Sequence, residues 1–172
     1  MRRPFSSRAN TTPSVPVRPE GRDGSLNDLT AVVNSIWEQV RASAAYGINS
    51  FPGWQPLFNE QMQRAQLTRA DGPGKGLALS FYKDEQDTWL FERIEWQPSL
   101  ETEGFGKTTR NTTMYPLSEI SPGTQSREIG TLQADGAFAV ENIISLSGIE
   151  PLNQNSINWL TEQFTAFTAS IR

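Results

Sequence analysis

The sequence predicts an α+β protein: an antiparallel sheet of about five strands with an N-terminal and a C-terminal amphipathic helix packed on it. Three observations support this. Apolar residues repeat at helical spacing near both ends of the chain. Short aromatic-rich runs, separated by turn residues, occupy the middle. The first 24 residues are rich in Pro, Ser, Thr and Arg. We therefore expect an extended basic arm over residues 1–24 and a single α+β domain over residues 25–172.

The two helices are expected over residues 26–45 and from about residue 155 to 170. Ser25 can cap the first helix, with Asp28 three positions later, and Gly47 can end it. We expect both apolar stripes to pack on the sheet of the same molecule, and an oligomer seam is the alternative. The stripe residues are Leu26, Leu29, Val33, Ile36 and Val40 in the first helix, and Ile157, Leu160, Phe164, Phe167 and Ile171 in the second.

Residues 77–97, LALSFYKDEQDTWLFERIEWQ, predict the central hairpin of the sheet. Two apolar runs flank a polar turn at residues 83–87, and both runs carry bulky side chains on both faces. Such strands are typically covered on both sides, so we expect this hairpin to lie inside the sheet. Alternation along the second run separates its side chains into two sets, with Leu90, Glu92, Ile94 and Trp96 on one face and Trp89, Phe91, Arg93 and Glu95 on the other.

Four further segments complete the predicted sheet. Residues 57–68 fit either a short helix or a strand, and we favour a strand near residues 63–69. The threonine-rich residues 108–115 suit an exposed edge strand, with Arg110 as a charge that discourages edge pairing. A second hairpin is expected over residues 127–146, because Asp135-Gly136 is a strong turn signal.

The composition removes most catalytic chemistry. The chain contains no cysteine and no histidine, which excludes thiol nucleophiles, thiolate metal sites and the commonest general base. Residues 104–109, GFGKTT, resemble the end of a phosphate-binding loop. A complete loop needs glycine at position 101, where Glu101 stands, and a helix must follow, whereas TTRNTTMYP favours a strand. We therefore predict no catalytic residue, no cofactor and no metal.

Charge is unevenly distributed. Residues 1–25 carry five arginines against two acidic residues, a net +3, whereas the remainder carries 10 basic and 17 acidic residues, a net −7. The acidic body argues against nucleic-acid binding, for which only the basic arm offers phosphate contacts. No apolar run approaches the ~18 residues of a membrane span. We expect a cytoplasmic protein or a component of a soluble assembly, and the Arg- and Ser-rich start also resembles an organelle transit peptide.

The main functional hypothesis is a non-enzymatic protein–protein interaction module: a subunit, adaptor or chaperone-like component of a larger assembly, or a homo-oligomer. A virion structural component is an alternative. The order helix, antiparallel hairpins, helix is similar in outline to small secretion chaperones and viral assembly modules, without a shared motif. The arm would be the docking element. The candidate partner-binding residues are Arg2, Arg3, Phe5, Arg8, Arg18, Phe51 and Trp54.

Two alternatives use the central hairpin. One is a carrier of a small apolar ligand or chromophore, with an enclosed aromatic pocket in a curled sheet formed by Trp89, Phe91, Glu92 and Trp96. Trp54 and one face of the hairpin could form an aromatic platform for such a ligand. The other is a carboxylate-only enzyme using Glu92 or Glu95. Glu92 interrupts an apolar face, so we expect a structural ion pair with Arg64, Arg69 or Arg110.

Overall fold

The computed structural model describes residues 24–48, 50–100 and 106–169. The predicted arm, apart from Gly24, lies outside these residues. The fold class is α+β, as predicted, but the sheet has seven strands rather than about five. The elements are α1 (Leu26–Tyr46), β1 (Gln55–Asn59), β2 (Arg64–Gly72), β3 (Lys75–Lys83), β4 (Trp89–Pro98), β5 (Thr108–Pro116), β6 (Gly123–Leu132), β7 (Phe138–Ile149) and α2 (Gln154–Ala169).

All seven strands are antiparallel, and their order in the sheet follows the sequence from β1 to β7. The ambiguous segment over residues 57–68 contains the end of β1 and the start of β2, and the strand favoured near residues 63–69 corresponds to β2. Every second residue of β1 is partly buried, and Phe58 packs edge-on against Trp37 of α1 with ring centres 5.2 Å apart. A strand fits this two-residue period, which a helix does not.

The prediction of an edge strand at residues 108–115 is wrong. β5 lies inside the sheet, hydrogen-bonded to β4 on one side and β6 on the other. Arg110 does not protect an edge, because its guanidinium is paired with Glu128 of β6 at 2.8 Å. The predicted inner hairpin, β3 and β4, does lie between β2 and β5. Local sequence signals could not separate these cases, because β-branched residues suit inner and edge strands alike.

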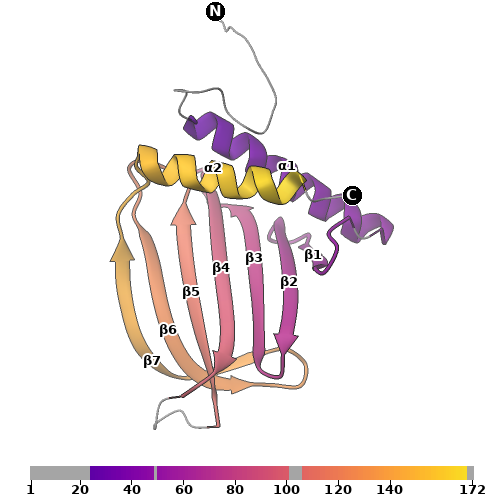
Figure 1. Ribbon diagram of the computed structural model, residues 1–172, viewed down its shortest axis with the longest axis vertical. Coiled ribbons are helices and arrows are strands. Elements are labelled where there is room, and N and C mark those ends of the chain that lie inside the picture. Colours follow the sequence, from indigo (N-terminus) through magenta and orange to yellow (C-terminus); the bar gives the residue numbers. More distant parts are fainter. Residues whose placement is uncertain (1–23, 49, 101–105, 170–172) are drawn as a thin grey trace, which may run out of the picture.

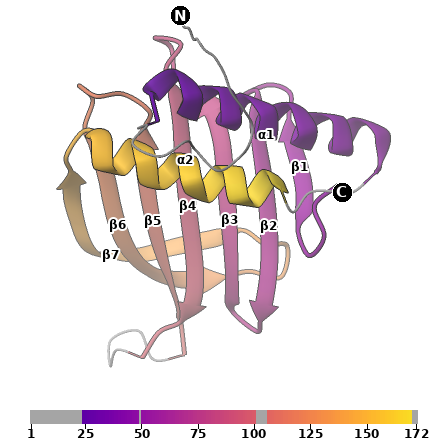
Figure 2. The same cartoon turned by 45° about the horizontal axis from the view of Figure 1, so that its top comes forward.

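Both helices cover the same face of the sheet and cross one end of its strands (Figures 1 and 2). The cap of α1 is the predicted one. Ser25 Oγ accepts from the backbone N–H of Asp28, and the Asp28 carboxylate accepts from the backbone N–H of Ser25, both at 3.0 Å. Gly47 ends the helix at φ +69°. Both predicted stripes pack on the sheet of their own chain, except that Ile171 lies outside the described residues. Four residues of the α1 stripe have no exposed surface: Leu29, Val33, Ile36 and Val40.

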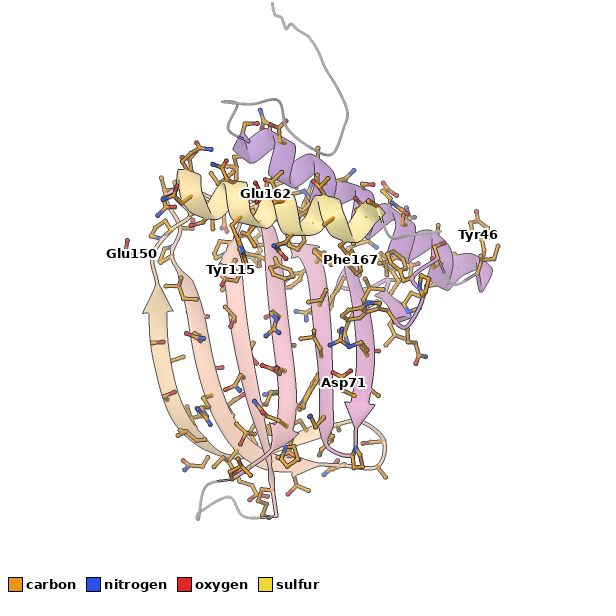
Figure 3. The ribbon with its side chains drawn as sticks, viewed as in Figure 1. Tyr46, Asp71, Tyr115, Glu150, Glu162 and Phe167 are labelled. Atoms are coloured by element: carbon orange, nitrogen blue, oxygen red, sulfur yellow. The ribbon has the colours of Figure 1, made fainter. Side chains whose placement is uncertain are left out.

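The core lies between the helices and the sheet. Phe81 of β3 and Phe91 of β4 stack with ring centres 5.3 Å apart, and Phe164 of α2 packs edge-on against both. Tyr115 of β5 and Phe167 of α2 extend this aromatic cluster toward its two sides (Figure 3). One face of β2, β3 and β4 thus completes the core, and Phe58 of β1 and Tyr115 of β5 pack against it.

The sheet curls away from the helices. The far ends of β6 and β7 bend and pass behind the other strands, on the side opposite α2 (Figures 1 and 2). Two register shifts in the β6–β7 ladder mark this bend, one between Arg127 and Glu128 and one between Ile129 and Gly130. A Cβ at Gly130 would lie 2.1 Å from the carbonyl oxygen of Ala139, so the two backbones approach too closely for a side chain. Bulges and glycines of this kind increase local bending.

Candidate functional site

The face of the sheet that the helices leave uncovered is called here the inner face. The register confirms the predicted division of β4: Trp89 and Phe91 belong to the core under the helices, whereas Glu92 and Trp96 lie on the inner face. The four residues of the predicted ligand pocket are therefore divided between the two faces of the sheet. Ile94 of β4 lies on the inner face too, and neighbouring strands add further residues, among them Gln66, Ser80, Met114 and Thr112.

Charged side chains on the inner face are largely shielded although no helix covers them. The side chains of Arg64 and Glu92 are 22% and 18% exposed, and those of Arg110 and Glu128 are 25% and 14% exposed. On a flat uncovered sheet, side chains of this length would extend into solvent. The curl of the sheet accounts for the shielding, because it brings the side chains of the inner face together.

One polar cluster joins β2, β3 and β4. Arg64 donates to Glu92 at 2.9 Å, which confirms one of the predicted partners of Glu92, and its guanidinium lies 4.0 Å from the ring centre of Tyr82. Burial raises the pKa of the Tyr82 phenol, and the neighbouring Glu92 carboxylate raises it further, whereas Arg64 partly opposes this. The cluster fixes the charge pair in place and contains no free nucleophile or base.

A second pair, Arg110 and Glu128, joins β5 to β6, and the Arg110 guanidinium lies 4.5 Å from the ring centre of Phe138. Among the residues that the structure describes, two buried donors of the inner face lack an acceptor: Arg64 Nε and the indole N–H of Trp96. A buried donor without a partner costs about 1–3 kcal/mol. The inner face therefore carries polar groups whose hydrogen bonds are incompletely satisfied.

A hollow of about 540 Å³ opens where the curled sheet fails to close, and it is called here the side hollow. β1 pairs with β2 only as far as Thr68, so the rest of β2 has a free edge. The turn between β6 and β7 approaches this edge. The lining residues are Gly53, Trp54, Gln55, Thr68, Arg69, Ala70, Lys75, Gly76, Leu77, Trp96, Leu132 and Gly136.

Two tryptophans line the side hollow, Trp54 from the segment before β1 and Trp96 from β4. Trp54 reaches the hollow from the helix-covered side and Trp96 from the inner face, so the two rings meet at the edge of the sheet rather than on one face of the central hairpin. Trp54 is half-buried, packs edge-on against Phe167 with ring centres 5.9 Å apart, and carries the Arg69 guanidinium 4.9 Å from its own ring centre. The hollow is open to solvent, whereas the carrier hypothesis expected an enclosed cavity.

The charged residues that line the side hollow are both basic. Arg69 donates to Asp71 at 2.8 Å and 3.3 Å. Asp71 lies on β2 far from the helices (Figure 3) and is not itself part of the lining. Lys75 is exposed, and no acidic residue of the described part of the chain lies within ion-pair distance of it. Sequence reasoning did not single out Arg69 or Lys75 for this role, because their proximity to Trp54 depends on strand pairing.

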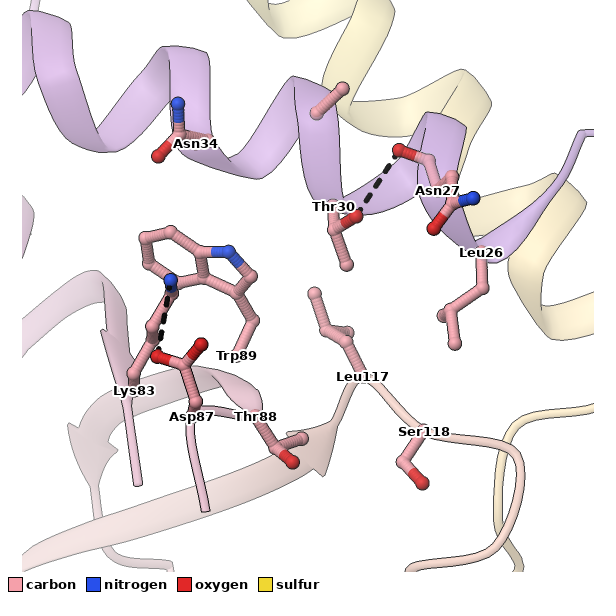
Figure 4. A pocket seen from close by; sticks show the side chains of 11 residues that line it. Leu26, Asn27, Thr30, Asn34, Lys83, Asp87, Thr88, Trp89, Leu117 and Ser118 are labelled. Atoms are coloured by element: carbon pink, nitrogen blue, oxygen red, sulfur yellow. Dashed lines mark hydrogen bonds and ion pairs between the residues drawn. The ribbon is translucent and has the colours of Figure 1, made fainter. Parts of the chain in front are cut away.

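A second hollow, of about 580 Å³, lies between the start of α1 and the turn that joins β3 to β4 (Figure 4). Lys83 pairs with Asp87 at 3.3 Å, and its ammonium lies 5.0 Å from the ring centre of Trp89. Thr30 and Asn34 of α1 form the opposite wall. The charged residues of this lining, Lys83 and Asp87, thus pair with each other, unlike Lys75 in the side hollow.

No relative identifies the chain. No protein-family model matches it, and no curated protein or solved structure is significantly similar to it. In the described ranges, no helix is long and apolar enough to cross a membrane.

The predicted partner-binding residues do not form one surface among the described residues. Arg2, Arg3, Phe5, Arg8 and Arg18 lie outside the described residues. Phe51 is 1% exposed and belongs to the core, so it could touch a partner only if the core opened.

The carboxylates do not form a catalytic pair. Glu92 lies on the inner face, whereas Glu95 lies on the opposite face, where it pairs with Arg93 at 3.5 Å. Two acids on opposite faces of one strand cannot act on one substrate. Lys107 and Thr108, from the segment that resembles a phosphate-binding loop, lead directly into β5 rather than into a helix. No helix N-terminus is therefore available there for a phosphate.

One strand edge remains uncovered on the far side of the sheet. β7 is an edge strand, and its apolar side chains Val140, Ile143 and Leu146 are 44%, 58% and 70% exposed. All three lie on the inner face, opposite Gly130, Glu128 and Ser126. A long apolar edge strand can pair with another chain.

Proposed function

We propose that the protein is a non-catalytic carrier that binds a small, largely apolar molecule in the side hollow. The observation that carries the proposal is that Trp54 and Trp96, which are 42 positions apart in the sequence, line one space of about 540 Å³ together with Leu77 and Leu132. Small-molecule sites typically enclose 300–1,000 Å³ and combine apolar walls with a few polar groups. The aromatic rings offer planar surface on which an unsaturated ligand can pack.

Because the side hollow is open to solvent, it affects how tightly a ligand is held and how it exchanges. A ligand held there keeps part of its surface in solvent. It can enter and leave without the helix-covered core opening, because the hollow lies at the free edge of β2 and is open to solvent. We expect reversible binding of moderate affinity, as an incompletely buried ligand gains less from removal of apolar area from water.

Titration with the uncharged fluorescent probe N-phenyl-naphthylamine tests the proposal. We expect saturable binding to the wild type. Leu132→Asn, which removes an apolar side chain from the lining, should weaken binding roughly tenfold. Leu57→Asn is the matched control, because Leu57 is 46% exposed on β1 and does not line the hollow. Equal binding to both variants, with unchanged melting temperatures, would locate the probe elsewhere and reject this site.

A second candidate function is the protein–protein interaction module expected from the sequence, and the exposed edge of β7 favours it. Residues 142–149, NIISLSGI, contain no charged residue and no proline, which suits pairing with a strand of another chain. Both helical stripes are used within the molecule, so contact surfaces must be sought elsewhere.

Native mass spectrometry of the protein recovered from its source separates the two candidates. A defined complex supports the interaction module, and a monomer with a bound small molecule supports the carrier. Combining Ile143→Lys with Leu146→Lys should abolish a complex that uses the β7 edge. The combination of Ser145→Lys with Ser147→Lys is the control, because these residues are exposed and alternate with the apolar ones on the same strand. Loss of the complex in both would indicate a general effect of charge.

A further inference from the structure

We infer that the ligand of the side hollow is an aromatic or otherwise apolar carboxylate, with its single negative charge placed beside Lys75 and Arg69. This inference rests on the proposed carrier function. It names the chemical class that the walls of the hollow select.

The sign of the ligand's charge follows from the lining. The chain as a whole is acidic, with 19 acidic against 15 basic residues, yet neither of the two charged residues that line the side hollow is acidic. A basic site on an acidic protein attracts an anion locally, while the surrounding surface repels it elsewhere. Charge complementarity of this kind selects among ligands of equal apolar surface.

The number of charges on the ligand follows from the ion pairs that the two basic lining residues make. Arg69 already has a carboxylate partner, since both its Nε and a terminal nitrogen donate to Asp71. Lys75 has no acidic neighbour within ion-pair distance among the described residues. Among the described residues, the Lys75 ammonium is therefore the one positive charge of the lining that no carboxylate pairs. A singly charged carboxylate matches it, whereas a phosphate dianion would add a second charge without a partner.

The position of the ligand's negative charge follows from the positions of the two basic residues. Lys75 begins β3, and Arg69 lies on the free edge of β2, with its guanidinium held over the Trp54 ring at 4.9 Å. The cationic group and the aromatic surface are thus neighbours in the wall of the hollow. A ligand whose acidic group is attached directly to its apolar body can contact both at once.

Two probes that share an aromatic skeleton test the inference: N-phenyl-naphthylamine, which is uncharged, and anilinonaphthalene sulfonate, which carries one negative charge. We expect the wild type to bind the sulfonate roughly three- to tenfold more tightly at low salt, and added salt to remove most of the difference. A naphthalene carboxylate should displace the sulfonate more effectively than naphthyl phosphate does.

Variants at the two ends of β3 locate the charge. Lys75→Gln should weaken sulfonate binding roughly three- to tenfold without changing binding of the neutral probe. Lys83→Gln is the matched control, because Lys83 ends the same strand and lies in the other hollow. Asp71→Asn should strengthen sulfonate binding, since it frees the Arg69 guanidinium from its carboxylate partner.

The outcomes distinguish the carboxylate inference from the carrier function on which it rests. Neutral and anionic probes that bind equally, and that both ignore Lys75→Gln, would overturn the carboxylate inference and leave the carrier function standing. Failure of both probes to bind would overturn the carrier function and this inference together. Stronger displacement by naphthyl phosphate than by the carboxylate would overturn the assignment of a single charge.

Discussion

At the scale of single residues, each face of β4 carries a glutamate that pairs with an arginine, and the two pairs differ in their exposure to solvent. Glu92 pairs with Arg64 at 2.9 Å in a shielded setting, whereas Glu95 pairs with Arg93 at 3.5 Å with both side chains more than 40% exposed. Water screens the exposed pair, so it contributes little to stability. Removing one partner of the shielded pair should lower the free energy of unfolding, because the remaining charge would be shielded from water without a partner.

We therefore expect Glu92→Gln to lower the free energy of unfolding by about 1–3 kcal/mol, since Arg64 loses its carboxylate inside the curled sheet. Glu95→Gln should lower it by less than about 0.5 kcal/mol. Urea denaturation followed by tryptophan fluorescence measures both. Equal effects at the two positions would contradict the view that curvature shields the inner face.

Tyr82 makes stability depend on alkaline pH. Burial and the nearby Glu92 carboxylate raise its pKa, so the folded state holds the phenol proton more tightly than the unfolded state does. The stability contributed in this way is fully present below the ordinary tyrosine pKa of about 10 and is lost as the pH rises through the folded-state pKa.

We expect the difference in unfolding free energy between the wild type and Tyr82→Phe to fall as the pH rises above about 10. Tyr46→Phe is the control, because Tyr46 is 77% exposed at the end of α1. Urea denaturation at a series of pH values, with parallel titration of the phenolate absorbance, measures the difference. A difference that does not change with pH would contradict a raised pKa of Tyr82 in the folded state.

At the scale of elements, the β6–β7 hairpin determines the shape of the sheet. Its two register shifts bend the strands, and Gly130 permits the close approach of Ala139 at one of them. The turn of this hairpin supplies Leu132 and Gly136 to the side hollow. Curvature and the candidate site therefore have a common origin in this hairpin.

Gly130→Ala should lower the free energy of unfolding by roughly 2 kcal/mol or more, because the added Cβ would overlap a backbone oxygen that cannot rotate away. Gly148→Ala on β7 should cost less than about 1 kcal/mol, since nothing lies within 4 Å of its added Cβ. Thermal melts of the two variants give the comparison. Binding of the neutral probe should fall only in Gly130→Ala if the hairpin positions the side hollow.

At the scale of the whole molecule, the two ends of the described chain hold each other. The backbone N–H of Gly24 donates to Asn158 of α2 at 3.0 Å, and Gln154 of α2 donates to the Gly24 carbonyl. The beginning of α1 is thereby tied to α2 over 130 residues of sequence. The docking arm expected from the sequence precedes this point, so its role can be separated from folding.

Removal of residues 1–22, which keeps Gly24 and its peptide N–H, should change the melting temperature by no more than about 2 °C, because no described contact is lost. If the arm is a docking element, the same truncation should abolish partner recovery in a pull-down. Recovery of the partner at the wild-type level would exclude the arm as the docking element.

The sequence by itself determined the local features of this protein. The positions of both helices, the cap at Ser25, the stop at Gly47 and the turn at Asp135-Gly136 were predictable, because each depends on residues within a few positions of one another. The two faces of β4 followed from its alternation. That Glu92 would pair with Arg64, Arg69 or Arg110 followed from the cost of an unpaired carboxylate on an apolar face, and the structure selects Arg64.

The tertiary structure decided which strands lie at the edges, how the sheet curls and which side chains meet at the side hollow. These features depend on pairings between distant segments and on two register shifts, and no local pattern encodes them. Trp54 and Trp96 illustrate the difference. Each is conspicuous in the sequence, but only the curl of the sheet and the short reach of β1 bring them to one space beside Arg69 and Lys75.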